Sequence, residues 1–84
     1  MHVFQTRRLN ERGDEIAVGN SSWDNDDISA KYRWRDRRGH WARGGEVPAT
    51  CVPIMMAEII KSGHLDRDSI DPDDLRLIQN FVSN

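Results

Sequence analysis

The side chains in this sequence that are best suited to nucleophilic catalysis are one cysteine and three histidines. Cys51 is the only thiol, and the only imidazoles belong to His2, His40 and His64. Cys51 lies at the expected start of a helix, where the helix dipole could lower the pKa of its thiol. A free cysteine is more often a small apolar residue on a helix edge. Because no base and orienting group are evident beside Cys51, we expect no catalytic residues and a protein that is not an enzyme.

Two aspartate-rich stretches could attract a cation, but neither has the ligand spacing of a metal site. Residues 64–74, HLDRDSIDPDD, contain five aspartates and one histidine. They superficially resemble a calcium loop, yet Ile70 takes a position that should bear an oxygen, and the glycine and final glutamate are missing. Residues 23–27, WDNDD, form a second carboxylate cluster. Aspartate also favours solvated loops and helix caps, so we expect no metal site and no cofactor.

The densest group of potential binding residues is the segment KYRWRDRRGHWARGG, residues 31–45. It contains six basic residues and two tryptophans, with Asp36 as its single acidic residue. Arginine and tryptophan dominate the energetics of protein–protein interfaces. The same pair could bind single-stranded nucleic acid, with arginine on phosphate and tryptophan on an unstacked base. A solvated surface with no partner is the third interpretation.

Strand alternation divides this segment into two faces. In an extended strand, the side chains of Tyr32 and Trp34 point to one side of the sheet. Those of Lys31, Arg33 and Arg35 point to the other side. We therefore expect the aromatic face to join the core and the cationic face to meet solvent.

The length of the following turn decides which residues face each other across the hairpin. A three-residue turn with Gly39 as the bulge places Arg35 opposite Trp41, whereas a four-residue loop places Trp34 opposite Trp41. The first register is preferred because Asp-x-x-Gly suits it. In that register, cation–π contact between Arg35 and Trp41 is expected.

A repeated turn signal predicts two β-hairpins. Residues 10–13 and 36–39 each begin with asparagine or aspartate and end with glycine. The side chain of the asparagine or aspartate can form a hydrogen bond with the backbone two residues later. The glycine takes the positive φ that a type I turn followed by a bulge requires. The predicted hairpins span residues 2–18 and 30–43.

After residue 45 the apolar pattern changes to a helical period. Helices are predicted over residues 51–62 and 72–82, with Gly63 ending the first and Asp71 capping the second. Each helix carries an apolar stripe that we expect to be buried. The stripe residues are Val52, Met55, Met56, Ile59 and Ile60 on the first helix, and Leu75, Ile78, Phe81 and Val82 on the second.

These elements predict an α+β fold, an antiparallel sheet of two β-hairpins packed against one or two C-terminal helices. The 84 residues are expected to form a single domain, residues 1–84, which buries only about 60–65% of its unfolded surface. No apolar run is long enough to cross a membrane, and the N-terminal sequence lacks the apolar core of a signal peptide. We therefore expect a soluble cytoplasmic protein with no membrane partner.

Charge is distributed unevenly along the chain. Residues 1–45 carry nine basic and seven acidic side chains, whereas residues 46–84 carry three basic and seven acidic ones. The net charge of -2 and the sequence pI of about 5.8 argue against general polyanion binding, because nucleic-acid-binding domains are usually strongly basic. Because basic and acidic side chains are concentrated in different segments, the charge distribution favours specific electrostatic docking to a partner.

In general character the sequence resembles the small accessory proteins of bacteriophages, and anti-CRISPR proteins first among them. The shared features are a very short chain, dense opposite charges, no catalytic constellation and a strand at the start. The resemblance implies a protein that binds a host nucleoprotein complex by surface complementarity, often covering a site meant for nucleic acid. It covers no alignable segment, so it assigns no role to any residue.

We expect the contact residues to be the basic and aromatic side chains of the second hairpin, Arg33, Arg35, Arg37, Arg38, Trp41 and Arg43. The second candidate surface is an acidic patch that could pair with arginines that normally hold nucleic acid, Asp66, Asp68, Asp71, Asp73 and Asp74. The leading hypothesis is a non-enzymatic protein-binding module, an inhibitor from a mobile element that acts on a host nucleic-acid-handling complex. The alternative is a regulatory protein that binds nucleic acid directly through the same hairpin. The protein is expected to be a monomer or a small homo-oligomer, in the host cytoplasm if a phage encodes it.

Overall fold

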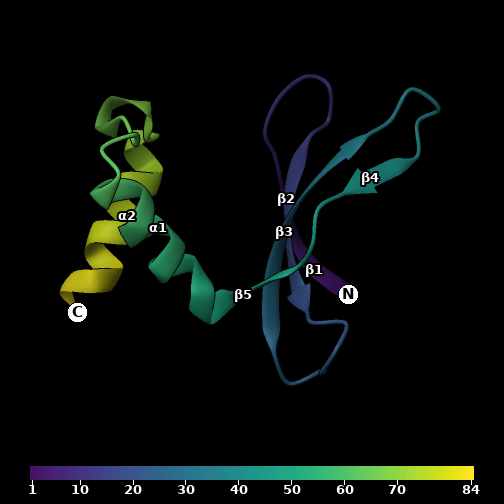
Figure 1. The fold of residues 1–84 in the computed structure, drawn as a ribbon, viewed down its shortest axis with the longest axis horizontal. Helices are drawn as coiled ribbons and strands as arrows, with labels where there is room; N and C mark the ends of the chain where they lie inside the picture. Colours follow the sequence, from purple (N-terminus) through teal and green to yellow (C-terminus); the bar gives the residue numbers. More distant parts are fainter. The chain divides into compact units, whose positions relative to one another are not determined.

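The computed structural model describes residues 1–84, except for the side chain of Arg43. The chain divides into two compact units, Met1–Pro53 and Ile54–Asn84. The first unit contains a β-sheet and the second contains most of the helical residues (Figure 1). The α+β fold class is thereby confirmed. The packing of helices on the sheet, and the single-domain organisation, stay predictions.

The described backbone of the first unit forms one antiparallel sheet of five strands. They are β1 (His2–Arg8), β2 (Glu15–Asn20), β3 (Ile28–Arg35), β4 (Trp41–Arg43) and β5 (Val47–Pro48). The strand order is β1-β2-β3-β4, and β5 also pairs with β3, at the end of β3 where β4 does not reach (Figure 1). Strand β3 is therefore the centre of the sheet, and both predicted hairpins are present.

Both hairpin turns use the predicted glycine, but they differ in length. Gly13 and Gly39 have φ of 89° and 79°, the left-handed region in which glycine carries no side-chain penalty. In the first turn, the amide of Leu9 donates to the carbonyl of Asp14 at 2.7 Å, which encloses four residues. In the second turn, the amide of Asp36 donates to the carbonyl of His40 at 2.8 Å, which encloses three. The three-residue turn predicted for the second hairpin is therefore confirmed.

The prediction of which sheet face is buried is wrong. Ala17 and Ser29 are fully buried and Lys31 is 8% exposed, and these residues lie on the face expected to meet solvent. On the other face Tyr32 is 43% exposed and Trp34 is 38% exposed.

Small residues explain why chain segments close over the face that carries Ala17 and Ser29. A Cβ at Gly19 would lie 2.1 Å from the carbonyl oxygen of His2, so the start of β1 crosses directly above this glycine. A bulge between Val3 and Gln5 re-aims β1 at this point. Close backbone approach of this kind is possible only over residues that lack a large side chain.

The helical segments start and end close to the predicted residues. A 3-10 turn, η1 (Ala49–Cys51), leads into α1 (Val52–Lys61), and η2 (Arg67–Ser69) precedes α2 (Pro72–Ser83). The Asp71 carboxylate caps α2 by accepting from the amides of Asp73 at 2.9 Å and Asp74 at 3.3 Å. Gly63 has φ of 75° and follows α1, as predicted for a helix end.

The expected burial of the two apolar stripes is wrong. No described residue of α1 or α2 is buried, and Phe81 and Val82 are 80% and 71% exposed. A stripe is buried only if a partner surface covers it. A unit of about thirty residues is too small to enclose two stripes by itself, since chains below about 40 residues rarely build a sufficient core.

Candidate functional site

The β3–β4 hairpin brings one tryptophan and two arginines into contact. Arg35 lies directly opposite Trp41 in the sheet register, as predicted. The guanidinium carbon of Arg35 is 4.0 Å from the centroid of the Trp41 ring, and that of Arg33 is 4.4 Å from the same centroid. These distances are within the range of cation–π contact. We call Arg33, Arg35 and Trp41 the arginine–tryptophan cluster.

Within this cluster, Arg33 is also bound to the sheet by an acidic residue. Glu15 lies opposite Arg33 on β2, and its Oε1 atom accepts from both Nε and Nη2 of Arg33. The side chains of Arg33 and Glu15 are only 18% and 15% exposed, respectively. The carboxylate of Glu15 therefore balances the charge of Arg33, which makes Arg33 less available to a partner than the other predicted contact residues. The role of Arg33 is to position the ring of Trp41.

The tip of the hairpin carries two arginines that are open to solvent. Arg37 and Arg38 lie in the three-residue turn and are exposed. Among the described atoms their guanidinium groups form no hydrogen bond or ion pair, whereas Arg35 donates from Nη1 to the carbonyl of Gly39 at 2.8 Å. The Asp36 carboxylate orders the turn by accepting from the amides of Arg38 and His40, both at 2.9 Å. We call Arg37 and Arg38 the hairpin tip.

The structure thus brings most of the predicted contact residues into one hairpin. Three belong to the arginine–tryptophan cluster and two to the hairpin tip. The prediction for the Arg43 side chain lies outside the described part of the chain, although its backbone pairs with Arg33.

The acidic patch of residues 66–74 has local structural roles. Asp66 accepts from the amide of Asp68 at 2.9 Å and begins η2, while Asp71 caps α2. Asp73 forms an ion pair with Arg76 at 3.4 Å. Asp68 is exposed, and Asp74 is partly buried in the first turn of α2. Helix capping therefore accounts for part of this cluster, which was the alternative interpretation from sequence.

A second group of side chains, which the sequence interpretation missed, surrounds Asp14. This residue is only 6% exposed, and its Oδ2 atom accepts from Asn10 Nδ2 at 2.8 Å, Tyr32 OH at 2.8 Å and Arg12 Nη2 at 3.1 Å. These hydrogen bonds, that from Asn10 foremost, lower the pKa of the Asp14 carboxyl. The bond to Asp14 raises the pKa of Tyr32 in turn.

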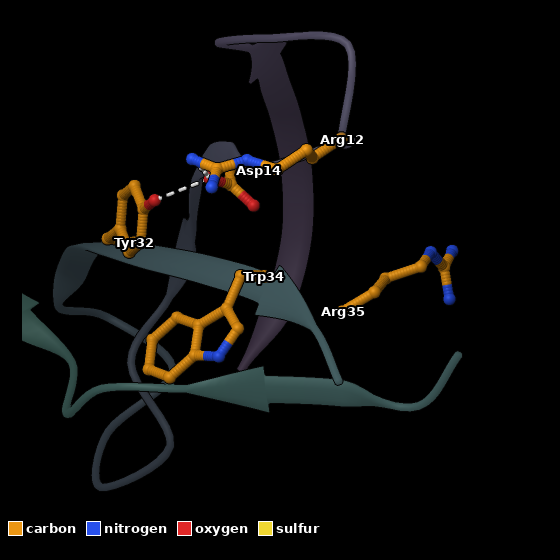
Figure 2. Close-up of a pocket in the computed structure, with 5 residues that line it drawn as sticks. All are labelled: Arg12, Asp14, Tyr32, Trp34 and Arg35. Atoms are coloured by element: carbon orange, nitrogen blue, oxygen red, sulfur yellow. Dashed lines mark hydrogen bonds and ion pairs between the residues drawn. The ribbon is translucent and has the colours of Figure 1, made fainter. Parts of the chain in front are cut away.

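Beside Asp14 the surface is hollowed, and the cavity has a volume of about 390 Å³. Its lining residues are Arg12, Asp14, Tyr32, Trp34 and Arg35. The ring centroids of Tyr32 and Trp34 are 5.7 Å apart and their planes are tilted by 37° (Figure 2). We call this cavity the Asp14 hollow. Strand alternation places Tyr32 and Trp34 on one side, but only the pairing of β2 with β3 brings Asp14 to them, so no single motif marks the site.

The chain matches no protein-family model, no curated protein and no solved structure. Among the described residues, no helix has the length and apolar character that a membrane crossing requires. The described histidine, cysteine, aspartate and glutamate side chains form no group of three that could hold a metal ion.

Proposed function

We propose that this protein is a non-enzymatic protein-binding module, and that the arginine–tryptophan cluster and the hairpin tip form its contact surface. The observation that carries the proposal is the contact of two guanidinium groups with the ring of Trp41, at 4.0 and 4.4 Å. These contacts hold Trp41 in place before a partner arrives, so less conformational entropy is lost on binding. Tryptophan and arginine are also the residue types most enriched in binding hot spots.

The hairpin tip supplies the charge that selects the partner. Arg37 and Arg38 are exposed and project from a turn that the Asp36 carboxylate orders. A guanidinium group recognises a carboxylate through two parallel hydrogen bonds. The proposed partner surface therefore carries aspartate or glutamate side chains opposite the hairpin tip, next to an apolar patch that receives Trp41.

Direct binding of nucleic acid is the second candidate function, and the site supports it less well. A nucleobase that stacks on Trp41 would have to displace a guanidinium group already over that ring. The charge of Arg33 is balanced by Glu15, which reduces the positive field of the cluster. The net charge of the whole chain, -2, opposes association with a polyanion. What favours this candidate is the pair of exposed arginines at the tip.

The finer proposal is an inhibitor from a mobile element that acts on a host complex handling nucleic acid. Its support is the segregation of charge, since residues 46–84 carry seven acidic and three basic side chains while the hairpin is basic. In this proposal the hairpin anchors the protein to the complex. The acidic patch of residues 66–74 is then the second surface, suited to arginines that otherwise hold nucleic acid.

Affinity capture with charge-reversal variants tests the protein-binding proposal. Tagged wild-type protein and the double variant Arg37→Glu/Arg38→Glu are used to capture proteins from a bacterial lysate, and recovery is quantified by mass spectrometry. We expect a partner whose recovery falls at least tenfold in the double variant, which corresponds to about 1.4 kcal/mol. The matched control is Arg67→Glu, an exposed arginine outside the hairpin, which should retain the partner. Equal recovery by the double variant would contradict the proposal.

A direct binding measurement separates the two candidate functions. Fluorescence polarisation with labelled single-stranded DNA and RNA at low salt should show no binding by the purified wild-type protein. Binding that weakens steeply with added salt, and whose salt slope is reduced in the Arg37→Glu/Arg38→Glu variant, would support the nucleic-acid function instead.

A further inference from the structure

We propose that the Asp14 hollow is a binding site for a cationic side chain, the ammonium of a lysine or the guanidinium of an arginine on a partner protein. The rings of Tyr32 and Trp34 form its walls, and the carboxylate of Asp14 is the counter-charge. This inference does not rest on the proposed function of the hairpin. Tyr32 and Trp34 alternate with Arg33 and Arg35 along β3, so the two rings that form the walls lie on the face of that strand opposite to Arg33 and Trp41.

The aromatic walls have the exposure and arrangement that a cation needs. Tyr32 and Trp34 are 43% and 38% exposed, although both are aromatic residues of the central strand. Their planes are tilted by 37° at a centroid separation of 5.7 Å, so the two rings form an open wedge and do not stack face to face. A cation within about 6 Å of such ring faces is attracted by their quadrupoles.

The carboxylate at the end of this wedge is held in its charged form. Asp14 accepts three hydrogen bonds at its Oδ2 atom, and its pKa is lowered mainly by the bond from Asn10. A carboxylate that is only 6% exposed interacts with a nearby cation more strongly than one surrounded by water. The hydroxyl of Tyr32 donates to this carboxylate, so its ring is fixed against the counter-charge (Figure 2).

The structure already contains a cation at this position. Arg12 Nη2 lies 3.1 Å from Asp14 Oδ2, yet the side chain of Arg12 is 81% exposed. Only the Asp14 side of this ion pair is shielded from water, because the Asp14 side chain is 8% exposed. A competing cation can therefore approach the carboxylate from solvent and replace Arg12. Arg12 therefore acts as an internal competitor that occupies the same counter-charge as the proposed ligand.

The other arginine of the lining does not oppose a bound cation. The Arg35 side chain extends away from Asp14 and Tyr32 (Figure 2). Its guanidinium carbon lies 4.0 Å from the Trp41 ring centroid, and its Nη1 atom donates to the carbonyl of Gly39. Once Arg12 is displaced, the charge that remains beside the rings is the negative charge of Asp14.

The test uses blocked tripeptides as probes and the side-chain NMR signals of the protein as the readout. Acetylated and amidated Gly-Arg-Gly and Gly-Lys-Gly are titrated into full-length protein, with Gly-Glu-Gly as the anionic counterpart. The arginine and lysine peptides should shift the indole N–H signal of Trp34 and the ring signals of Tyr32. The indole of Trp23, which donates to Asp27 at 2.8 Å in a different loop, should not shift. No shift with any peptide, in either the wild type or the Arg12→Ala variant, would overturn the proposal.

The Arg12→Ala variant distinguishes a cation site from an anion site by the direction of its effect. Removal of the competing Arg12 side chain should tighten binding of the arginine peptide about two- to fivefold, because the peptide no longer has to displace the ion pair between Arg12 and Asp14. Arg67→Ala removes the same charge at an exposed position outside the hairpin and should change the affinity less. Trp34→Leu should abolish binding in a protein whose backbone spectrum stays dispersed. Weaker binding in Arg12→Ala, or a preference for the glutamate peptide, would overturn the proposal.

Discussion

The guanidinium carbon of Arg35 lies 4.0 Å from the ring centroid of Trp41, and the two residues are direct partners in the β3–β4 register. This contact links turn length to side-chain chemistry. With one more residue in the loop, Trp34 would take the place of Arg35, and the cation–π contact would be lost. The three-residue turn and the arginine–tryptophan cluster therefore support each other.

The first prediction concerns the contribution of Trp41 to stability. Trp41→Leu removes the ring that two guanidinium groups contact, and it should lower the free energy of unfolding by about 1–2 kcal/mol. Urea denaturation followed by circular dichroism measures the change. Trp23→Leu is the matched control, because Trp23 is 52% exposed. This variant should lower the free energy of unfolding clearly less than Trp41→Leu does. Equal losses in the two variants would show that the cluster adds no stability.

The second prediction concerns the ion pair between Arg33 and Glu15, whose side chains are 18% and 15% exposed. A double-mutant cycle with Arg33→Met and Glu15→Gln should give a coupling free energy of about 1 kcal/mol. The same cycle on Lys61 and Glu58, which are 71% and 64% exposed, should give less than about 0.5 kcal/mol. The reverse order of the two couplings would contradict the role of Arg33 as a positioning residue.

The third prediction concerns Gly19, where an added Cβ would lie 2.1 Å from the carbonyl oxygen of His2. Gly19→Ala should destabilise the protein by about 2 kcal/mol or more, because a backbone atom cannot move aside at low cost. Gly44→Ala is the control, since a Cβ at Gly44 would meet nothing within 4 Å. Thermal unfolding of both variants measures the difference, and a Gly19→Ala protein as stable as the control would be inconsistent with the crossing of β1 above Gly19.

The fourth prediction follows from the lowered pKa of Asp14. A carboxyl whose folded pKa lies below its unfolded value stabilises the protein at neutral pH. That stability is lost as the pH falls from the unfolded value, 3.8, through the folded one. Urea unfolding of the wild type between pH 6 and about pH 2 should therefore show a decline that is smaller in Asp14→Asn. Asp26→Asn, a change at an exposed aspartate away from the Asp14 hollow, is the matched control. A decline of the same size in Asp14→Asn would exclude Asp14 as its source.

The local elements were predictable because their signals are local. Asp36 and Gly39 form a turn through hydrogen bonds that span only a few residues, and Asp71 caps α2 through amides two and three residues on. The register of the second hairpin follows from that turn. For this reason the contact between Arg35 and Trp41 could be expected before the structure was known.

The candidate sites were predictable only in part. The sequence identified the hairpin as a basic and aromatic segment, but it did not show that Glu15 balances Arg33. The Asp14 hollow has no sequence signal of its own, because Asp14 and Tyr32 are 18 residues apart and meet only when β2 and β3 pair.

By itself, the sequence of this protein determined the positions of the two hairpins and of the two long helices, the length of the second turn and the faces on which side chains alternate. These depend on backbone preferences and on hydrogen bonds between near neighbours. Only the tertiary structure decided which face of the sheet is buried. The aromatic face was expected to be buried, but Gly19, Ala17 and Ser29 let the chain close over the other face. Periodicity separates two faces, but burial depends on which face other chain segments can approach, and that is a property of contacts distant in sequence.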